Sequence, residues 1–443
     1  MLTARWLVGV RGTIARRAGW GLADQAFSSL TNFALSLVIA RAVSAANFGA
    51  FSLAFATYLL AMGLVRAVVA QPLIIRYSTA PEEQWRRGAA DGTGAAVVLG
   101  LVAAAIAAVV GVAGDGAFAQ AYLALAITFP GLLVQDCWRF GFLAKGEPKA
   151  AFANDVVWAL VLFPLLGVLA VTGGVSVFTA TLAWGGSATV AAVFGVVQSK
   201  TLPRPSNALS WWRTHRDIAP AYIGEFGATA GSAQAAMFGI GAVADLVVVA
   251  ALRAAEVLMG PLKTLAQGLR MVAQPEAVRS LARGGDLLRP CLLFSVAMAV
   301  LAAVAGTVLL LLPDTVGRAA LGDTWEPAQA VLLPYTLSVM AAGLLGGAQL
   351  GLHALVAVRR SLVARVAVSV MLVVFKIGGA VFAGAPGAAA GGAVAMWAGA
   401  GLWWWQLAQA RREHDTDATA GDGLHTAPLD ADLMNPEAAA TDP

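Results

Sequence analysis

This sequence has few charged residues: Asp, Glu, Lys and Arg make up 12% of its 443 residues, whereas soluble domains carry about 25%. Hydrophobic residues make up 59%, and the mean hydropathy is +0.75. Such scarcity of charge excludes an ordinary soluble domain. The net charge of +4 is not a sign of nucleic-acid binding, because the positive residues are distributed by membrane side, mostly in the segments predicted to be cytoplasmic. We therefore expect an integral membrane protein with many spans and no nucleic-acid partner.

Several chemical signatures are also missing. The only cysteines are Cys137 and Cys291, which excludes a disulfide framework and a cysteine metal site. No phosphate-binding loop of the form GxxxxGK[ST] occurs, so we expect no ATP hydrolysis by this chain. Residues 1–17 lack the apolar core of a cleavable signal. We predict a protein that is not an enzyme and that has no cofactor and no metal site.

Long apolar segments are abundant instead. A helix that crosses a bilayer needs about 20 mainly apolar residues. Twelve segments reach that length: 21–40, 48–70, 94–114, 121–142, 151–172, 178–197, 218–242, 244–268, 290–312, 328–350, 362–383 and 388–407.

The distribution of Lys and Arg predicts how these segments are oriented. With the N-terminus in the cytoplasm, 22 of the 29 basic residues lie in cytoplasmic segments, and only Arg41 and Arg318 lie on the opposite side. This bias predicts that both termini are cytoplasmic. The longest outer loop, 313–327, carries no plausible catalytic set, which argues against a membrane-embedded glycosyltransferase or polymerase.

A short repeat divides the chain in two. The motif VAQP at 69–72, followed by Arg76, recurs 203 residues later as VAQP at 272–275, followed by Arg279. Parallel repeats in transporters commonly hold the substrate path between them. We predict an all-α fold of about twelve transmembrane helices in two six-helix bundles. The first bundle, 1–217, includes the N-terminal tail and a central inner loop; the second is 218–409, and 410–443 is a disordered cytoplasmic tail.

Basic residues inside the predicted spans are the main candidates for binding a substrate. A charge at mid-bilayer costs about 2.5–3.5 kcal/mol on insertion scales, so such residues usually face a cavity. We expect a cavity that accepts an anionic headgroup, lined by Arg66, Arg253, Lys263 and Lys376. Lys263 and Lys376 could instead reach an interface through their long side chains. Lys263 also follows Pro261, where we expect an irregular helix backbone.

Acidic and amide residues complete the candidate site. Asp24 and Glu225 lie near the heads of corresponding helices, and we predict that they couple transport to an ion or a proton. Asn32 shares a polar helix face with Asp24 and is a further substrate-binding candidate.

Purely structural roles are the alternative for other charged residues in the spans. We expect Asp136 to pair with Arg139 and Glu256 with Arg253. Asp155 is expected to cap a helix.

Two stretches resemble bacterial polysaccharide exporters of the multidrug/oligosaccharidyl-lipid/polysaccharide superfamily. The first contains Asp24-Gln25, the run SSLTNF at 28–33, Ala40-Arg41 and Asn47-Phe48-Gly49. The second runs from Arg139 through Ala144-Lys145-Gly146 to Asp155. The twelve-span layout over 21–409 is similar as well.

The resemblance implies two helical bundles in a V, as in MATE transporters, and an O-antigen-type flippase of the bacterial inner membrane. Such a protein moves an undecaprenyl-diphosphate-linked oligosaccharide from the inner to the outer leaflet by alternating access. It would work among membrane lipids beside a polysaccharide polymerase or glycosyltransferases. A cation-coupled multidrug exporter and a lipid II flippase of the same superfamily are the alternatives.

Overall fold

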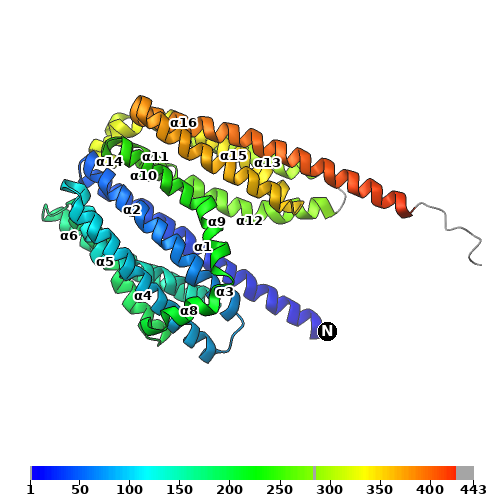
Figure 1. The fold of residues 1–443 in the computed structure, drawn as a ribbon, viewed down its shortest axis with the longest axis horizontal. Coiled ribbons are helices and arrows are strands. Elements are labelled where there is room, and N and C mark those ends of the chain that lie inside the picture. Colours follow the sequence, from blue (N-terminus) through cyan, green and yellow to red (C-terminus); the bar gives the residue numbers. More distant parts are fainter. Residues whose placement is uncertain (1, 283–285, 426–443) are drawn as a thin grey trace, which may run out of the picture.

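The computed structural model of the chain describes residues 2–282 and 286–425, and these residues form helices without any strand (Figure 1). The first part contains α1 (Leu2–Ala42), α2 (Ala45–Val65), the π-helix η1 (Arg66–Ala70), α3 (Gln71–Tyr77), α4 (Glu82–Ala113), α5 (Gly116–Ala144), α6 (Pro148–Val171) and α7 (Val177–Ser199). We call α1–α7 the N-terminal group.

The remaining helices follow a short connecting segment, residues 200–217, which contains η2 (Pro205–Asn207) and α8 (Ala208–His215). After it come α9 (Ala219–Phe226), the π-helix η3 (Gly227–Gly231), α10 (Ser232–Val243), α11 (Leu246–Leu258), α12 (Gly260–Ala282), α13 (Leu288–Leu310), α14 (Asp314–Leu321), η4 (Gly322–Thr324), α15 (Trp325–Ala354) and α16 (Val358–His425). We call α9–α16 the C-terminal group.

Helix α16 consists of two arms that fold back on each other. Its backbone is non-helical at Ala383 and at Gly384, where φ is +57°. A positive φ strains most residues but not glycine. The arms then pack closely, with Gly391 against the Phe375 backbone, because a glycine lets two membrane helices approach each other.

Eight helices in the described part of the chain are long and apolar enough to cross a membrane. Their outward faces carry large apolar side chains; Val109 and Val112 on α4, for example, are 69% and 79% exposed. Such exposure disfavours a water-soluble fold and suits contact with lipid. The prediction of an all-α membrane protein agrees with these features.

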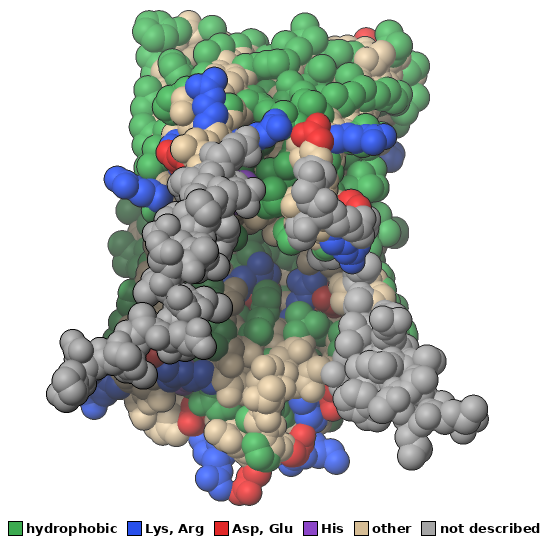
Figure 2. Space-filling model, turned by 90° about the vertical axis from the view of Figure 1, so that its right-hand side faces the viewer, with side chains coloured by type: hydrophobic (Ala, Val, Ile, Leu, Met, Phe, Trp, Pro, Cys, Tyr) green, Lys and Arg blue, Asp and Glu red, His purple; other side chains and the backbone are tan. Residues whose placement is uncertain are grey.

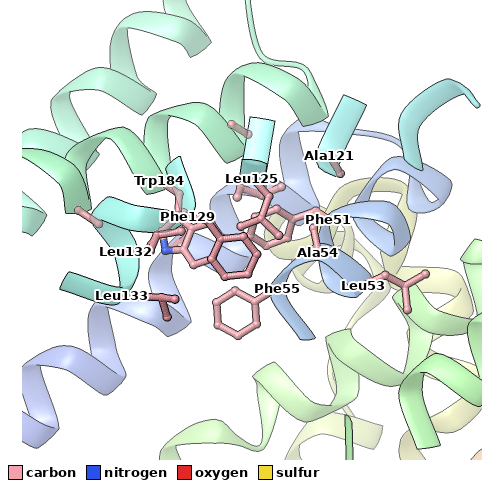
Figure 3. Close-up of a cluster of buried hydrophobic side chains, with 14 of the residues drawn as sticks. Phe51, Leu53, Ala54, Phe55, Ala121, Leu125, Phe129, Leu132, Leu133 and Trp184 are labelled. Carbon is pink, nitrogen blue, oxygen red and sulfur yellow. The ribbon is translucent and has the colours of Figure 1, made fainter. Parts of the chain in front are cut away.

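The N-terminal group is packed around an aromatic core. Phe51 and Phe55 of α2 meet Trp184 of α7, with ring centroids 5.9 and 5.3 Å apart, next to Phe129 of α5 (Figure 3). Each such pair contributes about 0.5–1.5 kcal/mol beyond the burial of its area. The core fixes α2 against α5 and α7, and so fixes the helix that carries Arg66 at its end.

The two groups meet at the end remote from the chain termini and separate toward the end that carries both termini (Figure 1). At the joined end a Cβ added to Gly49 would lie 1.9 Å from the carbonyl oxygen of Leu246. There, too, the Thr324 hydroxyl donates to the Ala40 carbonyl, at 3.5 Å. The contacts therefore close one end of the space between the groups.

Two segments that we expected to lack structure are helical. The outer loop 313–327 forms α14 and η4, which pack near the end of α1. Helix α16 continues through the start of the expected disordered tail to His425, and Arg360 forms an ion pair with Glu413 on that extension. This pair ties the extension to the first arm of α16. Residues 426–443 of the expected tail lie outside the described residues.

Candidate functional site

A cavity of about 750 Å³ lies between α1 on one side and α11 and α12 on the other. Viewed from the end that carries the termini, the molecule is hollowed at its centre, and Lys and Arg side chains are visible inside the hollow (Figure 2). The polar side of α1 contributes Asn32, and α11 and α12 contribute Arg253 and Lys263. Three of the five predicted substrate-binding residues therefore line one cavity.

A basic cluster from the C-terminal group forms one wall of this cavity. Arg253 donates from Nη1 to Glu256 at 3.0 Å, and Lys263 donates from Nζ to the other oxygen of Glu256 at 2.7 Å. Lys376 on α16 lies close enough for its charge to interact with both Glu256 and Lys263. Arg253 and Lys263 thus share one carboxylate, and the predicted pairing of Glu256 with Arg253 is confirmed. Lys376 is not among the residues that line the cavity.

Arg253 keeps an unused donor. Its guanidinium lies over the ring of Phe55, 4.4 Å from the centroid, a favourable cation–π position. Its Nε is buried, and no atom of the described residues accepts a hydrogen bond from it. A buried donor without an acceptor is costly, so this group favours a site that receives an anion.

A break between two helices lies between Glu256 and Lys263. Helix α11 ends at Leu258 and α12 begins at Gly260, with Pro261 as its second residue. Proline lacks an N–H and clashes with the carbonyl four residues earlier, so a continuous helix is disfavoured there. The predicted irregularity at Pro261 is confirmed, and it lies between the two residues that it brings together.

A second polar cluster lies within the N-terminal group. Arg66 binds Asp136 through two parallel hydrogen bonds, from Nη2 at 2.6 Å and from Nε at 2.8 Å. Arg139 binds Asp24 at 2.7 Å and lies 3.6 Å from Asp155. Three aspartates therefore face two arginines, so this cluster has an excess of negative charge.

The pairing in this cluster corrects two predictions. Asp136 was expected to pair with Arg139, but it binds Arg66, because α2 and α5 pack side by side and the guanidinium fork matches both carboxylate oxygens. Asp155 was expected to cap a helix. It lies inside α6 and is 1% exposed, where its carboxylate faces Arg139 instead of backbone N–H groups.

Amide side chains extend the N-terminal cluster, and the sequence reading missed them. Gln135 donates to Asp155 at 2.9 Å, and Asn154 donates to Gln198 at 2.9 Å. The available signal was an Asn-Asp pair within an apolar span, together with a Gln beside Asp136. Buried amides in a span need partners from other helices, and here they connect α5, α6 and α7.

The two clusters adjoin cavities that share a wall. A smaller cavity of about 160 Å³ lies beside Arg66, Asp136 and Arg139. Asn32 on α1 lines both this cavity and the larger one. One buried oxygen of Asp24 and one of Asp155 accept no hydrogen bond among the described residues.

The structure separates the two predicted ion-coupling residues. Asp24 is buried in the N-terminal cluster, whereas Glu225 lies on α9 with an exposed side chain. The suggested correspondence between Asp24 and Glu225 is therefore not matched by similar surroundings. The two VAQP motifs also differ in structure. The first spans the junction between η1 and α3, whereas the second lies within α12.

Several solved structures resemble this chain. One is a multidrug resistance MATE family transporter of the MOP superfamily in its inward-facing conformation, with a TM-score of 0.68, 14% identity and coverage of 88% of this chain and 96% of that one. Another is the lipid II flippase MurJ in its inward closed conformation, with a TM-score of 0.66, 10% identity and coverage of 87% and 86%. A third is a multidrug resistance MATE family transporter in its outward-facing conformation, with a TM-score of 0.52, 12% identity and coverage of 90% of this chain and 96% of that one.

The TM-score is higher for the inward-facing and inward closed structures than for the outward-facing one. All three are transporters or flippases, and none is an enzyme. No protein-family model matches the chain, and no curated protein sequence does so significantly. The chain has the MATE-like fold of transporters of the MOP superfamily.

Proposed function

We propose that this protein is a flippase that moves a lipid-linked oligosaccharide, carried on a diphosphate, from one leaflet of a bacterial inner membrane to the other. The observation that carries the proposal is the basic wall of the large cavity. Arg253 and Lys263 share the carboxylate of Glu256, the charge of Lys376 also reaches this carboxylate, and the buried Nε of Arg253 has no acceptor among the described residues. A diphosphate offers the acceptor oxygens and negative charge that this wall lacks.

The proposed arrangement has twelve spans in two halves, with both termini in the cytoplasm. Eight of the described helices are long and apolar enough to cross a membrane. The proposal reaches six segments on each side of the connecting segment by counting α9–α10, α11–α12 and α14–α15 as one segment each and α16 as two arms. The bias of Lys and Arg supports cytoplasmic termini. The cavity would then be open toward the cytoplasm and the inner leaflet, where such a substrate is made. Glycosyltransferases would supply the substrate and a polymerase would consume it.

The N-terminal cluster is proposed as the coupling site, with Arg66 as part of it. Its three aspartates outnumber its two arginines, and Asp24 and Asp155 each keep a buried oxygen that accepts no hydrogen bond from the described residues. A proton or a small cation would satisfy those oxygens. Asp24→Asn should then weaken the dependence of transport on an ion gradient, and unchanged dependence would argue against this role.

A cation-coupled multidrug exporter is the second candidate, and the acidic excess of the N-terminal cluster favours it. Such an exporter would be expected to present acids to a cationic drug. In the larger cavity two basic residues, Arg253 and Lys263, accompany the single acid Glu256, which favours an anionic substrate. A lipid II flippase would use the same basic wall and differs only in the sugar.

The test is export in a deletion strain that expresses variants of the protein. Arg253→Gln and Lys263→Gln, combined, should slow export of the glycan about tenfold or more, because hydrogen bonds between charged partners are strong. Glycan-lipid should then accumulate on the inner leaflet. Arg318→Gln is the matched control, since Arg318 is exposed and pairs with Glu326 away from the cavity. Normal export by the double variant, or lost drug resistance with intact glycan export, would contradict the proposal.

A further inference from the structure

The connecting segment between the two groups is built onto the N-terminal group. The backbone N–H of Arg204 donates to the carbonyl of Ala90 on α4, at 2.8 Å. A Cβ added to Gly94 would lie 2.2 Å from the backbone of Arg204, so only a glycine permits this approach. The segment is therefore docked along α4 and does not act as a loose tether.

Trp211 on α8 is the centre of this docking. Its side chain is 3% exposed and stacks on Tyr77 of α3, with ring centroids 5.9 Å apart and an interplanar angle of 19°. Its indole Nε1 donates to the carbonyl of Val68 at 2.9 Å. Val68 is the third residue of η1.

The carbonyl of Val68 needs this donor because of the residue that follows η1. In an α-helix a carbonyl accepts from the N–H four residues later, and four residues after Val68 is Pro72, which has no N–H. The backbone widens at this point, where the N–H of Gln71 reaches back five residues to the carbonyl of Arg66. Trp211 thus supplies the hydrogen bond that Pro72 removes.

The same short helix positions a charged residue of the N-terminal cluster. Arg66 is the first residue of η1, and its guanidinium holds both oxygens of Asp136. A second attachment lies just before α9, where Arg76 donates to the Thr214 carbonyl at 2.7 Å and to Asp217 at 2.5 Å. Displacement of α9 would therefore pull on the segment that carries Trp211.

We propose that Trp211 is a positioning residue: it completes the hydrogen bonding of η1, thereby fixes Arg66 against Asp136, and transmits movement of the C-terminal group to the N-terminal cluster. The inference rests on the proposed transport function only in giving Arg66 a role in the cycle. Its structural part, the dependence of η1 on Trp211, holds for any transported molecule.

The test is amide hydrogen exchange over residues 66–77 in the full-length protein, alongside glycan export. Trp211→Phe keeps the aromatic ring and removes the N–H. Exchange over 66–77 should rise on the order of fivefold, the effect of one lost hydrogen bond, and export should fall. Adding Pro72→Ala restores an N–H at position 72, and it should return both exchange and export toward the wild-type values.

Trp85→Phe is the matched control. Trp85 is also buried and donates to a backbone carbonyl, that of Gly141, at 3.1 Å. Its substitution should leave exchange over 66–77 unchanged. Unchanged exchange in Trp211→Phe, or a rise that Pro72→Ala does not reverse, would overturn the inference. If exchange behaves as expected while the wild type exports no glycan, the proposed function fails and the positioning role of Trp211 stands.

Discussion

Arg139 shows how single charges are stabilised inside this protein. Its side chain is 9% exposed and lies between Asp24 and Asp155, which are each 2% exposed at the side chain. Taking three charged groups out of water is costly, and their mutual attraction and hydrogen bonds offset that cost. The arrangement therefore links α1, α5 and α6 through the guanidinium of Arg139.

Replacing this arginine should destabilise the protein strongly. Arg139→Gln leaves two buried carboxylates without a counter-charge, and we expect a loss of about 3–5 kcal/mol in the free energy of unfolding. Thermal melting of the purified protein in detergent measures the effect. Asp24→Asn, added to the first change, should recover part of the loss because it removes one of the unpaired charges. A melting temperature for Arg139→Gln equal to that of the wild type would mean that water reaches the cluster.

Among the helices, two interruptions lie next to charged residues of the two clusters. The helix is interrupted between Glu256 and Lys263, where α11 ends and α12 begins, and the helical turn widens to a π-helix that begins at Arg66. Widened turns within α-helices occur often at functional sites. Beside each interruption a basic side chain binds a carboxylate: Lys263 binds Glu256, and Arg66 binds Asp136.

The sequence predicted one of these interruptions and not the other. Pro261 marks the break before Lys263, because proline disfavours a continuous helix. Pro72 and Pro275 lie in identical VAQP motifs, yet only the first follows a π-helix. The first motif also lies beside Trp211, which donates to the Val68 carbonyl and is 139 residues distant from Pro72 in the chain. A local motif carries no information about such a partner.

Contact between α2 and α11 controls the closed end of the space between the groups. Gly49 leaves no room for a side chain against the Leu246 backbone, so Gly49→Val should keep this end from closing. Asn32→Cys, in the cavity, should then react from outside the cell with a membrane-impermeant maleimide. Gly167→Val is the control, because nothing lies within 4 Å of a Cβ there. Equal labelling with and without Gly49→Val would show that this contact is not a gate.

For the whole molecule, the sequence predicted the membrane class and the charged residues in the spans. It predicted less well which of these residues form ion pairs. Charge scarcity and apolar segment length follow from the bilayer itself. The basic residues of the large cavity were found because charges in spans are rare. Spacing along one helix placed Asp136 near Arg139, but it could not reveal that Arg66 approaches from α2. Pairing between helices depends on packing, which periodicity does not encode.

The two clusters differ in the sign of their formal charge. The basic wall belongs to the C-terminal group, and the acidic excess belongs to the N-terminal group. In the proposed function, an anionic headgroup and a coupling cation would therefore bind to different charged residues, in two cavities that share the wall at Asn32.

The most direct measurement is transport in reconstituted vesicles of a fluorescent oligosaccharide attached to a polyprenyl diphosphate. The purified protein should move this lipid between leaflets and should move a matched lipid with an uncharged headgroup at least tenfold more slowly, because hydrogen bonds to charged phosphate oxygens are strong. Combined Arg253→Gln and Lys263→Gln should abolish the difference between the two lipids. Equal movement of both lipids by the wild-type protein, or expulsion of hydrophobic cations in preference to either, would contradict the account.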